Sequence, residues 1–106
     1  MAKMIWDNTD YGRYQVVEHT GWRDIGNYET LEERAGVYVF ANVDLQVKYI
    51  GKAGPGRMVK EIESAFDRGK DYGATRVMAM YTNSDKNALS LERALIDKYE
   101  PPNNYQ

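Results

Sequence analysis

The stretch GVYVFANVDLQVKYIG, residues 36–51, decides the fold of this chain. It holds two runs of apolar and aromatic residues, and such residues favour strands. Residues 42–45 predict a turn between the runs, because Asn and Asp side chains hydrogen-bond their own backbone. The two ends of an antiparallel hairpin lie side by side, so we expect Tyr38 and Tyr49 to be neighbours. Two phenols brought together beside two glycines indicate a functional site more than a core.

The bulk composition predicts one small cytoplasmic domain. A chain of 106 residues can bury a single core. The absence of cysteine excludes disulfides and thiolate metal sites, which suits a reducing compartment. No apolar run is long enough to span a membrane, and the first residues do not have the pattern of a signal peptide, so we expect no membrane association.

The charge balance argues against a strongly basic nucleic-acid coat, because the net charge is −2. It is uneven along the chain: residues 1–34 carry seven acidic and four basic side chains, whereas residues 35–106 carry nine acidic and ten basic ones. A local basic surface is therefore compatible with the second part.

Before the hairpin, the sequence predicts only short elements. Residues 1–13 are polar and aromatic and are expected to form a loosely held arm. Residues 14–19 have the composition of a strand, and residues 22–25 are its expected return strand after a Thr-Gly turn. Thr30 resembles a helix start, with Glu33 placed to complete a capping box.

After the hairpin, the pattern becomes helix, strand, helix. Residues 52–57 form an irregular Gly-Pro loop, and a helix is predicted over residues 57–68, with Gly69 as its stop. Residues 75–82 predict a strand, and a second helix runs from Ser84 or Asp85 to about Tyr99, where two prolines end it. The apolar stripes of these helices are Met58, Ile62, Ala65 and Phe66, and then Ala88, Leu91, Leu95 and Ile96.

This order predicts an α+β fold: a small, mainly antiparallel three-stranded central sheet flanked by helices, with an extra N-terminal β-like segment. We expect residues 1–34 to form an N-terminal extension that packs on a domain formed by residues 35–106.

Two charged residues are candidates for chemistry, each with a structural alternative. Glu92 borders the apolar stripe of the second helix, where a carboxylate is costly to bury unless a cation accompanies it. The alternative is an edge carboxylate that contacts Lys52, Arg93 or solvent. Arg57 follows a glycine-rich loop that lets backbone amides approach a phosphate, or it is a solvated first-turn arginine.

The remaining functional residue types limit the metal chemistry. His19 is the only histidine, and a single histidine on a β-like segment is most often structural or exposed. Any catalytic metal therefore needs oxygen ligands, which favours Mg²⁺ or Mn²⁺. Several aromatic residues could stack on bases but are expected to serve packing instead: Trp6, Tyr11, Tyr14, Trp22 and Tyr28.

The ordered set of these features resembles the GIY-YIG nuclease superfamily over about residues 35–104. It comprises Gly36-Val37-Tyr38, Tyr49-Ile50-Gly51-Lys52-Ala53, Arg57, Glu92 and Asn104. The second tyrosine follows the first by eleven residues, and the helix containing the glutamate runs into prolines and a closing asparagine, as in the family.

The resemblance implies hydrolysis of DNA phosphodiester bonds with one divalent ion, Mg²⁺ or Mn²⁺. Glu92 is then the sole protein carboxylate on that ion, and Tyr38 is the general base, directly or through Tyr49. Lys52 and Arg57 supply the positive charge that a phenol needs near neutral pH, and Arg57 stabilises the transition state.

Three further residues have supporting roles in this interpretation. Gly36 and Gly51 allow a close approach of backbone and substrate, and Asn104 hydrogen-bonds across the end of the helix.

The sequence also departs from the family pattern. Many members carry the arginine deeper in the helix, so Lys60 and Arg68 are alternatives to Arg57. A His or Tyr often follows one turn later, where this chain has Glu61, and Tyr72 is the expected replacement from the next loop.

Two functions follow from these residues. The first is a metal-dependent endonuclease acting on DNA, with RNA left open, whose specificity comes from residues 1–34, from a homodimer or from a protein partner. The alternative is a weak or inactive module of the same fold that binds nucleic acid or protein.

Overall fold

The computed structural model describes residues 4–105 and arranges them around an antiparallel sheet. The central strands are β3 (Gly36–Ala41), β4 (Val47–Ala53) and β5 (Arg76–Tyr81), with β3 paired to both of the others. Two short strands, β1 (Glu18–His19) and β2 (Arg23–Asp24), pair with β5. The strand order is β1-β5-β3-β4, which leaves β4 at one edge. The predicted α+β fold with an antiparallel sheet and flanking helices is confirmed.

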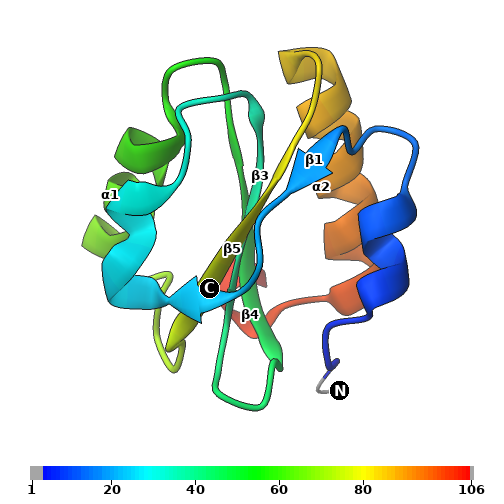
Figure 1. The fold of residues 1–106 in the computed structure, drawn as a ribbon. Helices are drawn as coiled ribbons and strands as arrows, with labels where there is room; N and C mark the ends of the chain where they lie inside the picture. The colour runs from blue at the N-terminus through cyan, green and yellow to red at the C-terminus, as the bar shows by residue number, and fades with distance from the viewer. Residues whose placement is uncertain (1–3, 106) are drawn as a thin grey trace.

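The two helices α1 (Met58–Asp67) and α2 (Asp85–Tyr99) cover opposite faces of this sheet (Figure 1). The alternation of side chains along β3 explains the division, because successive strand residues point to opposite faces. Tyr38 and Phe40 lie in the core under α1, whereas Val37 and Val39 lie in the core under α2. All six residues of β3 are buried. The central strand therefore separates two cores, and its tyrosine belongs to the α1 side.

The predicted stripe of α1 is confirmed, because Met58, Ile62 and Ala65 are buried. The start of this helix depends on a residue distant in sequence: the Val59 N–H donates to the Glu33 carboxylate at 2.9 Å. A carboxylate at a helix N-terminus satisfies an unpaired donor and interacts favourably with the helix dipole.

The capping box predicted at Thr30 is therefore wrong. Thr30 ends the 3₁₀ helix η2 (Ile25–Thr30) instead of starting a helix, and Glu33 caps α1.

The second helix, α2, begins and ends as the sequence predicts. The Ser84 side chain accepts a hydrogen bond from the Asn87 N–H, which is an N-cap. After Tyr99, Glu100 adopts the left-handed conformation (φ 44°), and the short 3₁₀ helix η3 (Pro102–Tyr105) follows.

The two N-terminal strands do not form the predicted hairpin. Both pair antiparallel with β5: Glu18 lies opposite Tyr81, and Arg23 lies opposite Val77. Residues 18–24 thus form one interrupted edge strand, and Thr20 bridges the interruption by bonding to both backbone groups of Ala79. Strands of two residues have too little periodicity to reveal their partner.

The prediction of a loose arm is wrong for residues 4–13, and residues 1–3 lie outside the described part. The Trp6 ring is 6% exposed and stacks on Tyr99 with ring centroids 5.2 Å apart. The 3₁₀ helix η1 (Asn8–Gly12) lies beside α2 in Figure 1.

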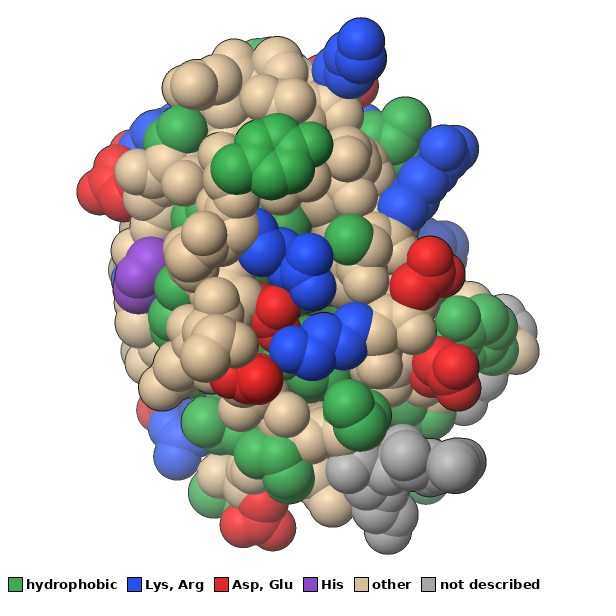
Figure 2. Space-filling view, turned by 90° about the vertical axis from the view of Figure 1, so that its right-hand side faces the viewer, with side chains coloured by type: hydrophobic (Ala, Val, Ile, Leu, Met, Phe, Trp, Pro, Cys, Tyr) green, Lys and Arg blue, Asp and Glu red, His purple; other side chains and the backbone are tan. Residues whose placement is uncertain are grey.

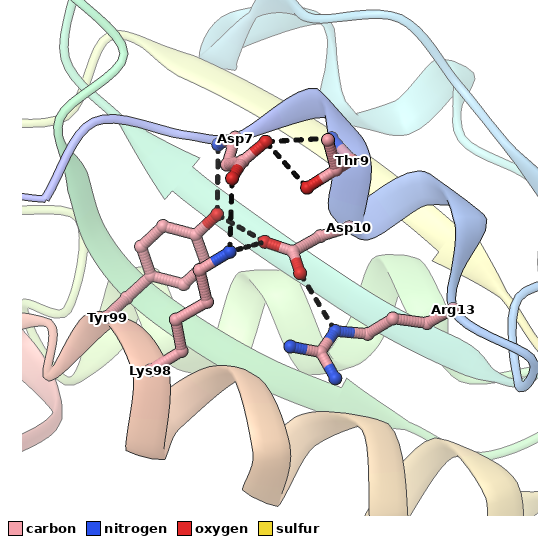
Figure 3. Close-up of polar contacts among 6 residues, drawn as sticks. All are labelled: Asp7, Thr9, Asp10, Arg13, Lys98 and Tyr99. Atoms are coloured by element: carbon pink, nitrogen blue, oxygen red, sulfur yellow. Dashed lines mark hydrogen bonds and ion pairs between the residues drawn. The ribbon is translucent and has the colours of Figure 1, made fainter.

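A buried carboxylate fixes η1 to α2 (Figure 3). The Asp10 carboxylate, in a residue only 4% exposed, accepts hydrogen bonds from the Tyr99 hydroxyl at 2.5 Å, Lys98 Nζ at 2.8 Å and Arg13 Nε at 2.9 Å. Asp7 adds contacts to the same lysine and tyrosine. A buried carboxylate is tolerable when it is paired and hydrogen-bonded in this way.

Figure 2 shows this side of the molecule, where acidic and basic side chains are interspersed and neither sign forms a continuous patch. Within residues 4–105, none of the helices combines the length and apolar character that crossing a bilayer requires.

Candidate active site

The α1 face of the β3–β4 hairpin holds the two predicted tyrosines. Tyr38 lies opposite Gly51 and Phe40 lies opposite Tyr49, so the two phenols are diagonal neighbours on the α1 face. Their ring centroids are 6.1 Å apart. The predicted proximity of Tyr38 and Tyr49 is confirmed, and it results from the antiparallel register.

Gly51 provides the space that the Tyr38 ring occupies. A Cβ atom at Gly51 would lie 2.2 Å from Tyr38 Cζ and 2.3 Å from its hydroxyl oxygen, far inside van der Waals contact. Gly36 allows a different close approach, because a Cβ there would lie 2.2 Å from the backbone oxygen of Met80 on β5. The two glycines thus fix the position of one phenol and the spacing of two strands.

Tyr38 is a protonated phenol in this arrangement. Its side chain is buried, and its hydroxyl donates to the backbone oxygen of Glu61 at 3.3 Å. Burial raises the pKa of Tyr38 strongly, the neighbouring Tyr49 raises it further, and the charge of Arg68 acts in the opposite direction. Arg68 is therefore a cation that favours the phenolate, a role that the sequence suggested for Lys52 and Arg57.

Arg57 is the N-cap residue of α1, and its side chain is exposed. Its Nε lies 3.4 Å from a carboxylate oxygen of Glu61, one helical turn later. Lys60 is exposed on the same helix, and the exposed Arg68 follows its last turn, where Arg68 Nε donates to the backbone oxygen of Ser64 at 3.3 Å. Arg57 and Arg68 thus lie at the two ends of α1; Arg57 is paired with an acid, and the charge of Arg68 acts on Tyr38.

Glu92 lies on α2 and therefore on the other side of the sheet from the two phenols. The side chain is half-buried, and burial raises the pKa of Glu92, while the charges of Lys52 and Arg93 lower it. Lys52 is itself engaged with another carboxylate, since its Nζ pairs with Asp85 at 2.6 Å. The Glu92 side chain makes no hydrogen bond or ion pair with another of residues 4–105.

These properties fit a site for a hard divalent cation. A carboxylate whose charge is destabilised by burial gains from a bound cation, and oxygen is the ligand that Mg²⁺ prefers. Residues 4–105 contain no group of three Asp, Glu or His side chains placed to hold an ion. An ion held by Glu92 would therefore draw most of its ligands from outside these residues.

The Asn104 side chain forms two hydrogen bonds with the outer edge of β4, at Ile50. Its side-chain oxygen accepts from the Ile50 N–H, and its amide donates to the Ile50 oxygen, both at 2.9 Å. These bonds satisfy the two outward backbone groups of an edge strand. Asn104 therefore holds the Tyr49-Ile50-Gly51 segment, whereas the sequence placed its hydrogen bonds across the end of the helix.

Asn103, the residue before Asn104, was not predicted from the sequence as part of the site. This side chain is 1% exposed, and its amide donates to the backbone oxygens of Lys70 at 2.8 Å and Tyr72 at 2.9 Å. The adjacent asparagines after two prolines were the only signal, and nothing local distinguishes them. Tyr72 itself is 77% exposed in the loop after α1.

Comparisons with known proteins agree on one family. Residues 34–105 match the family model described as UvrC-like GIY-YIG domain. UvrABC system protein C of Bacteroides thetaiotaomicron is 33% identical over 84 residues, which is 72% of this chain and 14% of the relative. The same protein of Pseudoalteromonas translucida is 36% identical over 81 residues, 69% of this chain and 13% of the relative. The chain thus spans about one seventh of these relatives.

Solved structures match the fold as well. The magnesium-bound GIY-YIG N-terminal endonuclease domain of UvrC from Thermotoga maritima superposes with a TM-score of 0.62 at 28% identity. The match covers 74% of this chain and 93% of that domain. A point mutant of the same domain, also with its catalytic divalent cation, gives the same TM-score.

Proposed function

The chain belongs to the GIY-YIG nuclease superfamily through its UvrC-like GIY-YIG domain, and from this membership we propose that it hydrolyses DNA phosphodiester bonds with one divalent metal ion. The observation that carries the proposal is the placement of Tyr38, pressed against Gly51 and beside Tyr49 in a chain that matches the nuclease family. Because β4 has a glycine at position 51, the Tyr38 ring can lie where a larger side chain would otherwise stand.

Glu92 would hold the metal ion as its only protein ligand. A bound Mg²⁺ or Mn²⁺ polarises the phosphate and stabilises the charge that develops on it. Glu92 supports this role because burial raises its pKa, and a nearby cation offsets that cost. Lys52 lies close enough to lower the pKa of Glu92, so it adds positive charge on the same side.

Tyr38 would accept the proton of the attacking water, directly or through Tyr49. The raised pKa of Tyr38 means that this step needs added positive charge near the phenol. Arg68 already acts in that direction. Arg57 would bind the phosphate, and its guanidinium must then exchange the Glu61 carboxylate for a phosphate oxygen.

Three residues would position the site without taking part in the chemistry: Gly36, Gly51 and Asn104. Gly51 accommodates the phenol, Gly36 sets the β3–β5 distance, and Asn104 fixes the backbone between Tyr49 and Gly51. Lys60 is exposed on α1 and is proposed to contact the DNA backbone.

Residues 1–34 are proposed to be an extension that packs on a nuclease domain formed by residues 35–106. The contacts of Asp10 with Lys98 and Tyr99 support this packing. A cytoplasmic location, and a homodimer or protein partner that adds specificity, stay predictions from the sequence.

Cleavage of supercoiled plasmid and of branched DNA in Mg²⁺ or Mn²⁺ tests the function. We expect Glu92→Ala to abolish the metal-dependent products, whereas Asp97→Ala, an exposed carboxylate on the same helix, keeps them. The proposal fails if purified protein gives no cleavage on any of these substrates, or if Glu92→Ala cleaves as well as the native chain.

One observation favours the alternative of a non-catalytic binding module: Arg57 already has an acidic partner in Glu61. Such a module keeps its affinity for nucleic acid with Tyr38→Phe or Glu92→Ala and shows no metal-dependent turnover. If that affinity is independent of salt, phosphate is not the ligand, and a protein partner is indicated.

A further inference from the structure

The loop between α1 and β5 presents an exposed aromatic ring beside the site. Tyr72 is 77% exposed, although large aromatic side chains are mostly buried in a small domain. We propose that Tyr72 is a stacking subsite for an unpaired base of the nucleic acid whose phosphate lies beside Tyr38 and Tyr49. This inference rests on the proposed function and specifies its substrate class, a strand with unpaired nucleotides within about three nucleotides of the cleaved bond.

The backbone under Tyr72 is held in place. Buried Asn103 donates to the Lys70 and Tyr72 carbonyls, and Lys70 Nζ donates back to the Asn103 oxygen at 3.2 Å. The next residue, Asn104, is bonded to β4 through Ile50. The backbone that carries the Tyr72 ring is therefore held by hydrogen bonds. Stacking of a base on the ring then costs little conformational entropy beyond that of the two Tyr72 side-chain torsions.

The same contacts place the loop at the β4 edge. Lys70 Nζ lies 6.0 Å from the centroid of the Tyr49 ring, and a Cβ at Gly73 would lie 3.6 Å from Lys48 Cε. Lys48 and Gly51 are three residues apart on β4, or about 10 Å at roughly 3.3 Å per residue. The rise per nucleotide of a stacked strand is roughly 3.4 Å, so about three stacked nucleotides span that length. A strand with its phosphate at Tyr38 can thus reach Tyr72 with a base about three nucleotides away.

The charge near the site favours base contacts over phosphate contacts. Residues 57–72 contain four basic and four acidic side chains, and the whole chain has a net charge of −2. Attraction to a phosphate backbone is therefore weak, so affinity has to come from another source. Stacking on a base face supplies it only where the base has left the duplex, because paired bases cover each other's faces.

Binding without metal separates this subsite from catalysis. The probe is a fluorescein-labelled oligo-dT of about 12 nucleotides, within the size range of single-strand sites, and the same strand paired with oligo-dA. Dissociation constants are measured by fluorescence anisotropy in EDTA. We expect Tyr72→Ala to weaken binding of the single strand roughly 5- to 150-fold and to change duplex binding less than about twofold.

Three controls complete the test. Tyr72→Phe keeps native affinity, because stacking needs the ring and not the hydroxyl. Tyr14→Ala also keeps it, since Tyr14 is 85% exposed but follows η1 on the α2 side. Circular dichroism melts of all variants should coincide, because the contacts of this loop are made by its backbone.

The proposal is overturned if Tyr72→Ala binds the single strand as tightly as the native chain, or if single strand and duplex weaken equally. A loss with Tyr72→Phe as large as with Tyr72→Ala also overturns it, because the hydroxyl is then the active group. Binding that depends on Tyr72 in a chain that never cleaves DNA refutes the nuclease proposal and leaves the subsite supported.

Discussion

Replacing Gly51 with alanine adds one methyl group where the Tyr38 ring now lies. The new Cβ would stand 2.2 Å from Tyr38 Cζ and 2.3 Å from the hydroxyl oxygen. Ordinary carbon contacts are about 3.5 Å, so the ring must withdraw by about 1.3 Å. Tyr38 is 1% exposed and packs on Phe40 and Tyr49, which leaves the ring no free space to enter. Gly51 is not at positive φ, so the substitution tests steric crowding without backbone strain.

Two effects of different size follow. Overpacking of a dense core costs about 1–3 kcal/mol of unfolding free energy, which denaturant titration measures, with a melting shift of roughly 4–8 °C for each kcal/mol. A catalytic group displaced by about 1 Å can lose about 100-fold in rate, which the plasmid cleavage assay measures. We therefore expect Gly51→Ala to reduce turnover more than stability.

Two matched variants locate the cause. Gly26→Ala has no atom within 4 Å of its new Cβ and should leave both stability and cleavage unchanged. Tyr38→Ala together with Gly51→Ala removes the clash, so the two stability losses should not add. If Gly51→Ala is as stable and as active as the native chain, or if the losses add fully, the steric reasoning is wrong.

Three further predictions concern stability and binding. Asn104→Ala removes both bonds to Ile50 and should cost about 1–3 kcal/mol of unfolding free energy; an unchanged urea midpoint would contradict this role of Asn104. Burial alone would raise the pKa of Asp10, but hydrogen bonds from the lysine and tyrosine on α2 lower it below its ordinary value. Its stabilisation is therefore present above about pH 4, the ordinary aspartate range, and disappears as the pH falls through the lower folded value. Asp10→Asn should remove this acid-dependent part of the stability curve, and identical curves for the two proteins would refute the linkage. Glu61→Gln frees Arg57 from an exposed ion pair worth about 0.2–1 kcal/mol and should raise DNA affinity up to about fivefold by anisotropy, whereas weaker binding would show that the carboxylate does not compete with phosphate.

The elements with strong periodicity were predictable. The hairpin of residues 36–51 and the helices after it have alternating or helical apolar patterns that extend over at least two turns or five strand residues. Their caps are local as well, as with Ser84 before α2 and Gly69 after α1. In these elements the local hydrogen bonds and the burial of one apolar face favour the same secondary structure, so the sequence pattern predicts what the fold contains.

The N-terminal part was not predictable in the same way. β1 and β2 have two residues each, and their partner β5 is more than fifty residues away in sequence. Glu33 has a local pattern typical of a capping box, but its carboxylate caps α1 instead. A side chain chooses between local and distant donors by position in space, which sequence spacing does not encode.

The sequence by itself determined the hairpin, the two amphipathic helices and the pair of phenols, because strand and helix periodicity fix which side chains share a face. The tertiary structure alone decided that Gly51 leaves space for the Tyr38 ring and that Glu61 forms an ion pair with Arg57. It also decided that Asn103 and Asn104 hold the loop after α1 and the edge of β4 by hydrogen bonds. These contacts join groups that only packing brings within a few ångströms, and hydrogen bonds and steric contacts act only at that range.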